Sequence, residues 1–594
     1  MKQEFGTRNC KNCNQKFTIE PDDFGFYEKI KVPAPTWCPE CRIQRRLAFR
    51  NERSLYKNKC GLCGKNTLSI HSPGGPFVDY CVGCWYSDAW DPMEYGRDYD
   101  FSRPFFEQYH ELYKAVPQQA LYHKFSTDSS FANFLEGAKN TYLSYSALYS
   151  ENVFYSKNID ACFWIADSFD LVNSRQCFGS ISSQNLFNCK FAYFSKECVD
   201  SSFVYDCINC TNCFLCTNLR GKKYCFKNRQ LSKDEYEKEV AAYATGSLNN
   251  LQRILGEFEN IVKGSLHKYG RIVNCINSTG DDLRNSKNSE NSFSAYDLEN
   301  VKYAFRSLKL KDSMDVINAG SGMELAYEFI NGGGNNSRLV RFCSYGIEAL
   351  NDVYYVDSCA SAGSLFGCVG LRNKEYCILN KQYSKEEYEK MIPSIIAHMN
   401  DMPYVDKKGR TYKYGEFFPP ELSPFAYNET IAQEYFPLTK EEAIGRGYRW
   451  RDPDTKGYKI TKTSEDLPDH IEDADDGILK EIIGCAHNQT CNEQCTAAFK
   501  IIPDELQFYR KMNLPLPRLC PNCRHYQRLK KRNPLKLWHR KCQCAGVGSE
   551  NGIYQNSITH QHGEVRCPNE FETPYAPDRS EIVYCETCYN SEVA

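Results

Sequence analysis

The chain carries two copies of one Cys-Pro-x-Cys-Arg segment, one near each end. Pro33, Cys38, Cys41, Arg42 and Arg46 recur, in the same order and at the same spacing, as Pro515, Cys520, Cys523, Arg524 and Arg528. Two cysteines separated by two other residues can place both sulfurs on one metal ion. The repeat therefore predicts that the two ends fold alike, each around matching cysteine pairs.

The cysteine pairs predict structural zinc. The chain has 594 residues and 32 cysteines, and Cys-x-x-Cys pairs in a large chain without an export signal favour metal thiolates over disulfides. Up to four zinc sites, each with four cysteine ligands, are expected, with the ligands Cys10, Cys13, Cys38 and Cys41; Cys60, Cys63, Cys81 and Cys84; Cys491, Cys495, Cys520 and Cys523; and Cys542, Cys544, Cys585 and Cys588. The fourth group has an irregular spacing, so Cys567, Cys485 or His539 could substitute there. The alternative is buried free thiols.

Each second cysteine pair runs into a basic segment. Residues 42–59 hold seven Arg or Lys and one acid, and residues 524–541 hold eight and no acid. The first segment lacks Gly and Pro up to Arg53, which predicts a helix with arginines on one face. Because guanidinium groups bind phosphate through two hydrogen bonds, we expect nucleic-acid contacts from Arg42, Arg45, Arg46, Arg50, Arg53, Arg524, Arg528, Lys530, Lys531 and Arg532. The alternative is a solvated basic helix.

The middle of the chain predicts a duplicated β-solenoid. A nine-residue register runs from Val153 through Cys162 to Cys225, with Asn and Ser at the expected corners, and such regularity is typical of stacked coils. The block recurs: E-N-V-F-Y at 151–155 returns at 299–303, D-S-F-D-L-V-N at 167–173 returns at 312–318, and the segment 216–238 returns at 368–390. Each half ends in a charged helix with an N-cap serine, Ser232 or Ser384, expected to cover the open sheet edge.

The expected fold is therefore mainly β: a duplicated, parallel β-helix-like solenoid flanked at both ends by treble-clef or zinc-ribbon modules. The expected segments are a tandem zinc module (1–94), an aromatic connector with a helix (95–130), two solenoid halves with capping helices (131–245 and 246–403), a linker with a small insert (404–484) and a second tandem zinc module (485–594). Cys207, Cys210, Cys213 and Cys216 could bind a metal, but the internal copy keeps only the first and last of them, which favours packed thiols.

The motif C-P-E-C-R-I-Q-R-R-L-A-F-R-N-E-R and the two Y-C-[FI]-[KL]-N segments resemble uncharacterised zinc-ribbon proteins with Cys- and aromatic-rich repeats, as in candidate-phyla bacteria. The resemblance implies no activity.

Charge and hydropathy leave three functional hypotheses. The formal net charge is −2, there is no apolar run of about 18 residues, and the N-terminus lacks the apolar core of a signal peptide, so a cytoplasmic location and no membrane are expected. The first hypothesis is a non-enzymatic zinc protein that binds nucleic acid or a ribonucleoprotein through the basic helices. The second is a protein-interaction scaffold using the solenoid surface. The third is a β-helix enzyme acting on polysaccharide, which would need Asp167, Asp170, Asp312 and Asp315 to gather in a groove.

Overall fold

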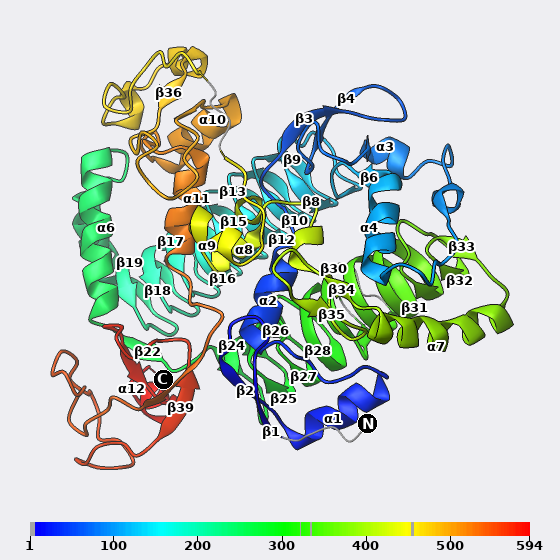
Figure 1. The fold of residues 1–594 in the computed structure, drawn as a ribbon. Helices are drawn as coiled ribbons and strands as arrows, with labels where there is room; N and C mark the ends of the chain where they lie inside the picture. Colours follow the sequence, from blue (N-terminus) through cyan, green and yellow to red (C-terminus); the bar gives the residue numbers. More distant parts are fainter. Residues whose placement is uncertain (1–5, 321, 333–335, 453–456, 594) are drawn as a thin grey trace. The chain divides into compact units, whose positions relative to one another are not determined.

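The computed structural model describes residues 6–320, 322–332, 336–452 and 457–593. The chain forms two compact units, which do not follow the order of the sequence. Unit 1 comprises residues 1–121, 270–452 and 534–537, and unit 2 comprises residues 122–269, 453–533 and 538–594. Each unit therefore combines one solenoid half with the metal-binding segment from the opposite end of the chain (Figure 1).

The solenoid half of unit 2 confirms the predicted β-solenoid and corrects its period. Apart from Arg229–Gln230 at the end, which pairs antiparallel, its strands pair in parallel with partners one coil away, for example Ala147 with Leu135 and with Ile159, and one coil is 12 residues. The strands are β7 (His123–Lys124), β8 (Asn133–Glu136), β9 (Lys139–Tyr142), β10 (Tyr145–Leu148), β11 (Glu151–Phe154), β12 (Lys157–Asp160), β13 (Phe163–Ala166), β14 (Phe169–Val172), β15 (Arg175–Phe178), β16 (Ile181–Gln184), β17 (Phe187–Tyr193), β18 (Ser202–Tyr205), β19 (Thr211–Thr217), β20 (Lys223–Phe226) and β21 (Arg229–Gln230).

The coil turns at every third residue. Asn152, Tyr155, Asn158 and Ala161 all have left-handed backbone conformations, which are strained for most residues but tolerated best by Asn and Asp. The residue after each of these points inward, so a coil presents four inward side chains and has four short sides. Each side is thus three residues long. The nine-residue register seen in the sequence spans three sides, whereas a complete coil has four.

Small polar side chains hold the coils together from inside. The Ser168 hydroxyl is fully buried; it accepts a hydrogen bond from the Ser180 amide at 3.2 Å and donates one to the Ala166 carbonyl at 2.9 Å. Cys162 makes the same pair of contacts with the Ser174 amide and the Asp160 carbonyl. Serine and cysteine can therefore occupy the same kind of inward position, because both are small and both can accept a hydrogen bond from a backbone amide of the next coil.

Replacing Ser168 by alanine is expected to destabilise unit 2 by about 1–3 kcal/mol, because the buried Ser180 amide loses its acceptor. Ser168→Cys keeps an acceptor of similar size and is expected to cost less. Urea unfolding of the metal-loaded protein measures both. Equal destabilisation by the two substitutions would contradict this account of the inward positions.

The solenoid half of unit 1 is built in the same way but has wider coils in its middle. Val301 pairs with Ser313, whereas Tyr327 pairs with Arg341 and Phe329 with Cys343, two residues further on than a regular coil requires. Its strands are β23 (Ile272–Val273), β24 (Gly280–Arg284), β25 (Lys287–Glu290), β26 (Ser292–Tyr296), β27 (Glu299–Lys302), β28 (Leu310–Ala319), β29 (Met323–Glu324), β30 (Tyr327–Gly332), β31 (Arg338–Phe366), β32 (Glu375–Ile378) and β33 (Lys381–Gln382).

Both predicted capping helices are present. α5 (Lys233–Ala241) and α7 (Lys385–Asp401) begin with the capping boxes of Ser232 with Glu235 and of Ser384 with Glu387. α5 packs on β20 and α7 on β32, the last parallel strands of the two halves. β20 and β32 also pair antiparallel with the two-residue strands β21 and β33, so a short hairpin and a helix together end each ladder.

The remaining elements of unit 1 surround its solenoid half. They include the expected connector helix, α4 (Phe105–Ala115), and, within the expected linker, α9 (Lys440–Gly445). The others are β1 (Gly6–Asn9), β2 (Lys16–Ile19), α1 (Pro21–Lys29), α2 (Pro39–Leu47), β3 (Tyr56–Lys59), β4 (Asn66–Ser69), β5 (Asp79–Tyr80), α3 (Val82–Trp85), β6 (Gln118–Gln119), β34 (Tyr404–Val405), β35 (Thr411–Tyr412), α8 (Ile431–Tyr435) and 3₁₀ turns at Pro92–Tyr95, Pro420–Leu422 and Tyr427–Glu429.

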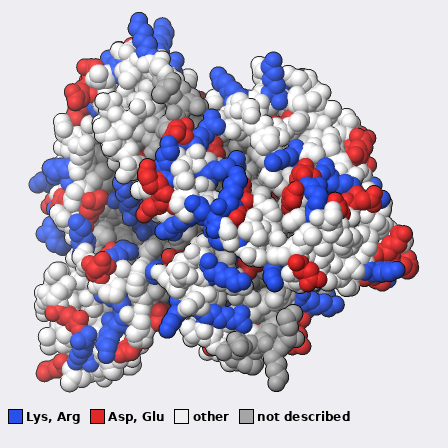
Figure 2. Space-filling model, in the orientation of Figure 1, with Lys and Arg blue, Asp and Glu red and all other residues white. Residues whose placement is uncertain are grey.

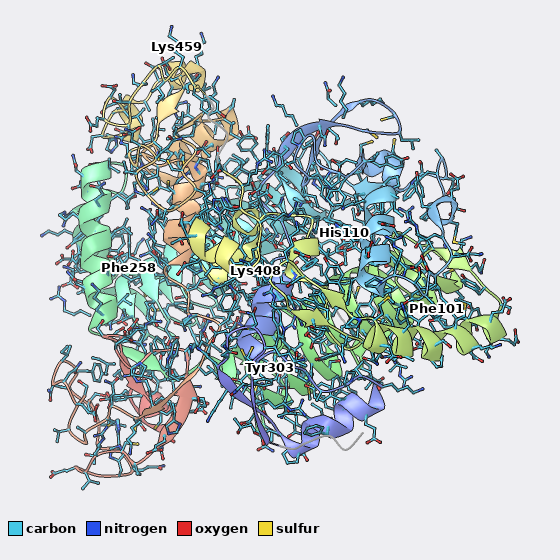
Figure 3. The ribbon with its side chains drawn as sticks, viewed as in Figure 1. Phe101, His110, Phe258, Tyr303, Lys408 and Lys459 are labelled. Atoms are coloured by element: carbon cyan, nitrogen blue, oxygen red, sulfur yellow. The ribbon has the colours of Figure 1, made fainter. Side chains whose placement is uncertain are left out.

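In unit 2, α6 (Leu248–Lys263) and the C-terminal segment cover two adjacent faces of the solenoid. Phe258 of α6, labelled in Figure 3, packs on Tyr193 and Phe203, and Phe508 packs on Phe178. The other elements are β22 (Leu266–Lys268), β36 (Ile483–Gly484), β37 (Ala498–Phe499), α10 (Pro503–Met512), α11 (Pro521–Leu529), β38 (Trp538–Lys541), β39 (Glu570–Thr573), β40 (Ile582–Tyr584), α12 (Glu586–Val593) and 3₁₀ turns at Ile471–Asp473 and Asp476–Lys480. Within the described part of the chain, every helix is too short or too polar to cross a bilayer.

Candidate metal centres and their basic helices

The four candidate metal centres share one local structure. In each, a two-stranded antiparallel hairpin holds the first cysteines, and a helix begins at or beside the next ones; the hairpins are β1–β2, β3–β4, β36–β37 and β38–β39, and the helices are α2, α3, α11 and α12. The first sulfur of each centre accepts a hydrogen bond from the amide of the cysteine at the helix start. The four pairs are Cys10 with Cys38 (3.2 Å), Cys60 with Cys81 (3.3 Å), Cys485 with Cys520 (3.2 Å) and Cys542 with Cys585 (3.2 Å).

The sulfurs of the first two centres lie at the spacing that a tetrahedral ion requires. Metal–sulfur bonds of about 2.3 Å at tetrahedral angles place two sulfurs about 3.8 Å apart. Cys13 and Cys38 are 3.8 Å apart, and Cys63 and Cys81 are 3.9 Å apart. The groups Cys10, Cys13, Cys38, Cys41 and Cys60, Cys63, Cys81, Cys84 could therefore each hold one ion, with the ligands that the sequence predicts.

The third centre differs from the prediction in one ligand. The structure groups Cys485, Cys495, Cys520 and Cys523, and Cys485 takes the role that Cys10 has in the first centre. Cys491, the expected ligand, has its sulfur 3.7 Å from that of Cys523, which is also the spacing of two sulfurs on one ion, so five cysteines gather at this centre. The hairpin turn between Cys485 and Cys495 is longer than the turn between Cys10 and Cys13. Because of this difference in length, the sequence does not show that Cys485 is the counterpart of Cys10.

The fourth centre is corrected in the same way. Cys542, Cys585 and Cys588 lie together as predicted, but Cys567 replaces Cys544 as the fourth sulfur, 3.8 Å from Cys585. Cys567 was one of the alternatives that the spacing left open. His539, another, lies on exposed β38 and contacts Glu570 and Glu572 instead. Cys544 belongs to a neighbouring group with His560, His562 and Cys588.

The arginines of α2 are buried against the solenoid half of unit 1. α2 packs on β28 and β30 (Figure 1), and it ends at Leu47, before Arg50 and Arg53. Arg42 and Arg46 both pair with Asp315 at 2.8 Å, and the side chains of all three are at most 2% exposed. Arg46 and Arg45 also share Glu328, at 2.7 and 2.8 Å.

The same contacts are repeated in unit 2. Arg524 and Arg528, the counterparts of Arg42 and Arg46, pair with Asp167 at 2.5 and 2.6 Å. Arg524 also lies over the ring of Tyr155, as Arg42 lies over that of Tyr303, which is labelled in Figure 3. Asp167 therefore corresponds to Asp315. This is the match that results when the two E-N-V-x-Y segments are aligned. Aligning the two D-S-x-D segments would instead match Asp167 with Asp312, which lies one side of the coil before Asp315.

These contacts correct the expectation of solvent-exposed basic faces. Arg50 is buried beside Glu52 and Asn331, and Arg53 lies 3.8 Å from Glu434. Of the other expected phosphate contacts, Arg532 lies over the ring of Phe169, Lys530 pairs with Glu493 and Lys531 pairs with Glu259. Runs of arginine that look like a phosphate-binding face in the sequence are thus matched to carboxylates of the protein itself.

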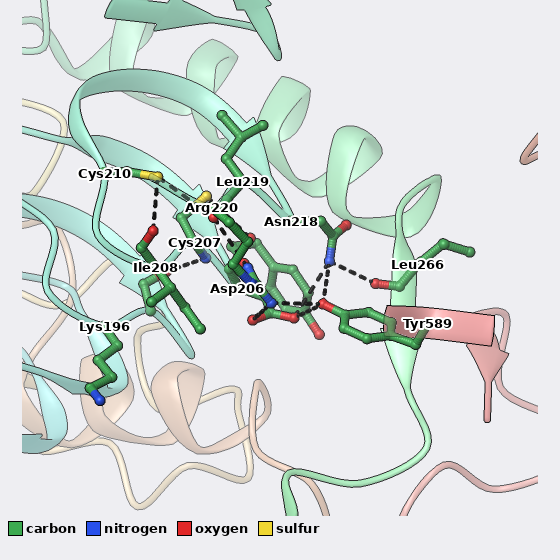
Figure 4. A network of polar contacts seen from close by, with 12 residues as sticks. Lys196, Asp206, Cys207, Ile208, Cys210, Asn218, Leu219, Arg220, Leu266 and Tyr589 are labelled. Carbon is green, nitrogen blue, oxygen red and sulfur yellow. Dashed lines mark hydrogen bonds and ion pairs between the residues drawn. The ribbon is translucent and has the colours of Figure 1, made fainter. Parts of the chain in front are cut away.

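The fourth metal module is anchored to the solenoid half of unit 2 by a polar network (Figure 4). Tyr589 of α12 follows Cys588, a candidate metal ligand. Its hydroxyl contacts Asp206 and accepts hydrogen bonds from Asn218 at 3.0 Å and from Arg220 at 3.3 Å. β40 of this module also pairs in parallel with β22, the strand that follows α6. This metal centre is therefore tied directly to a corner of the coil.

The solenoid cysteines are placed as packed thiols. Cys207, Cys210 and Cys216 point inward, and each donates to the carbonyl two residues earlier, at 3.3–3.6 Å. This geometry favours the packing interpretation of the cysteine run over a further metal site.

The four aspartates considered for polysaccharide chemistry each have a polar or charged partner within their own unit. Asp167 lies in unit 2 and Asp315 in unit 1, and each is engaged by two arginines. Asp312 pairs with Lys29, and Asp170 accepts a hydrogen bond from Ser182.

Comparison of the chain with protein-family models, with curated proteins and with solved structures finds no match.

Proposed function

We propose that this protein is a non-enzymatic interaction scaffold in which structural zinc ions fold four small modules, the modules clamp the solenoid halves, and the uncovered solenoid faces bind a protein partner. Zinc is the metal we propose because tetrahedral thiolate groups suit it, and a centre with four protein ligands has no open position for a substrate. Free thiols in such number also favour a reducing compartment such as the cytoplasm.

The observation that supports this proposal is the division of the solenoid surface in unit 2. Two adjacent faces pack against α6, α10 and α11, and the other two carry exposed side chains along the coils that precede the contact of Arg220 with Tyr589. On the exposed faces, Phe163 and Phe187 lie two coils apart with Arg175 between them, and Leu148 and Val172 flank Asp160 in the same manner. Aromatic residues and arginine, as in the column of Phe163, Arg175 and Phe187, are enriched at protein interfaces.

The exposed surface of unit 1 argues for a protein partner over a polyanion. Lys287, Glu299, Lys311, Glu324 and Arg338 stack in one column across successive coils, so that charges of opposite sign alternate. Two of the neighbouring pairs lie within 3.8 Å. Basic and acidic side chains are also intermingled over the face shown in Figure 2. A polyanion binds most strongly where one sign of charge accumulates.

Nucleic-acid binding through the two basic helices is the weaker candidate. It would require the arginines of α2 and α11 to leave buried carboxylates, which costs several kcal/mol for each uncompensated charge. Lys530, whose side chain is 68% exposed, is the most accessible of the basic residues considered, and it already faces Glu493.

The test is affinity capture with quantitative mass spectrometry on the zinc-loaded protein, comparing wild type with Phe163→Asp/Phe187→Asp. Val405→Asp, which changes an exposed apolar residue of unit 1 away from the solenoid ladders, is the matched control. The proposal predicts one or a few proteins captured by wild type and by the control but lost by the double variant. Identical capture by all three, or capture that depends on nucleic acid and disappears after nuclease treatment, would contradict it.

A further inference from the structure

The long hairpin turn of the fourth module carries a second group of metal-ligating side chains beside the four-cysteine centre. Cys544, His560, His562 and Cys588 place one ligand atom each within 4.8 Å of one another. Cys542, Cys567, Cys585 and Cys588 do the same. The two groups share Cys588 and no other residue.

The ligand atoms in the second group have the spacing of a tetrahedral site. The Cys544 sulfur is 3.2 Å from His560 Nδ1, and the Cys588 sulfur is 3.3 Å from His562 Nε2. A sulfur and a nitrogen bound to one zinc-like ion, at about 2.3 and 2.0 Å, lie about 3.5 Å apart. Three of the four ligands are buried, and His562 is half-buried.

The two histidines are also held by their other nitrogens. His560 Nε2 lies 2.9 Å from the carboxylate of Glu592, and these two side chains are at most 1% exposed. His562 Nδ1 lies 2.7 Å from the carbonyl oxygen of Val565. An acceptor on the far nitrogen fixes the tautomer whose lone pair faces the site, which is the usual support of a metal-bound histidine. Thus the tautomers at both rings are set for ligation at the atoms that face the sulfurs.

We propose that the fourth module holds two zinc-type ions, one bound by Cys542, Cys567 and Cys585 and the other by Cys544, His560 and His562, with the Cys588 thiolate bridging them. Each ion then has four protein ligands. Binding releases the thiol protons, while the histidines bind as neutral rings. The centre ties α12 to both ends of the long turn between Cys542 and Cys567, and this inference does not depend on the identity of any partner.

The first test counts ions in the full-length protein by native mass spectrometry and elemental analysis. Wild type is expected to bind five zinc ions per chain, and His560→Gln/His562→Gln is expected to bind four while remaining folded, because the four-cysteine centre keeps its ligands. His539→Gln, which changes an exposed histidine of the same module, is the matched control and should retain five. Four ions in wild type, or five in the double variant, would overturn the second site.

The second test addresses the bridge. In protein loaded with ¹¹³Cd, a shared Cys588 thiolate is expected to give scalar coupling between two cadmium resonances, and both resonances should change in Cys588→Ser. The coupling should vanish in the histidine double variant, which retains one ion in this module. Five bound ions with no pair of coupled resonances would overturn the bridging role of Cys588.

Discussion

Replacing Asp315 by alanine is expected to destabilise the packing of α2 on the solenoid half of unit 1 by about 3–5 kcal/mol, because Arg42 and Arg46 would remain buried without a compensating charge. Both arginines pair with Asp315 at 2.8 Å, and the carboxylate is fully buried. The free energy of opening, measured by hydrogen exchange at the α2 amides of zinc-loaded protein, gives the size of the effect.

Asp312 provides a matched control on the same strand. It lies three residues before Asp315, is partly exposed and pairs with Lys29, whose side chain is 51% exposed. Asp312→Ala is therefore expected to cost less than about 1 kcal/mol. Asp167→Ala should reproduce the large effect in unit 2, where Arg524 and Arg528 lose their shared partner. Equal effects of Asp312→Ala and Asp315→Ala would contradict the buried-pair account.

The contribution of Asp315 to the stability of the protein should decrease at low pH. Burial alone would raise its pKa, but Arg42 and Arg46 outweigh burial and hold the pKa below the ordinary value of 3.8. A carboxyl whose pKa is lowered by folding stabilises the protein above its unfolded pKa and loses this contribution as the pH falls through the folded value. The difference in stability between wild type and Asp315→Asn should thus persist at pH 5 and shrink below about pH 4.

Removing the metal is expected to have the largest effect of all. Structural zinc contributes on the order of 10 kcal/mol or more to the folding of small modules, and α2 and α11 are held by such modules. Chelation should therefore abolish hydrogen-exchange protection in α2 and α11. The coils should retain more protection, because their ladders and inward serines do not involve the metal.

The control for chelation is a comparison of two cysteine substitutions in unit 1. Cys41→Ser removes a ligand of the first centre and should release its ion and unprotect α2. Cys275→Ser changes a half-buried thiol of the solenoid that donates to the Val273 carbonyl and should do neither. Unchanged protection of α2 after verified loss of the ion would contradict the role given to the metal.

Features encoded by local patterns could be predicted from the sequence. The Cys-x-x-Cys pairs, the capping serines Ser232 and Ser384, and the repeated blocks each specify a local structure with few alternatives, and the structure contains the corresponding hairpins, helices and coils. Cys485 and Cys567 were harder to assign, because the turns that follow Cys485 and Cys542 are enlarged, so the matching ligand lies far along the chain.

The environment of the arginines could not be predicted from local charge. Arg46 meets Asp315 and Glu328, which are 269 and 282 residues away. Counting charges in a segment treats its arginines as solvated, although tertiary contacts can bury them against carboxylates. The length of one coil was also ambiguous in the sequence. Inward-facing residues recur at every third position, so residues nine apart match as well as residues 12 apart.

Arginine footprinting tests the central claim most directly, namely that metal-folded modules hold the arginines of α2 and α11 inside the protein. The zinc-loaded protein would be treated with phenylglyoxal, and the modification of each arginine followed by mass spectrometry. Arg338 and Arg566, whose side chains are both 54% exposed, serve as internal references. We predict that Arg42, Arg46 and Arg528 react much more slowly than the references and become reactive after chelation. Reaction at the rate of the references in the zinc-loaded protein would contradict the account.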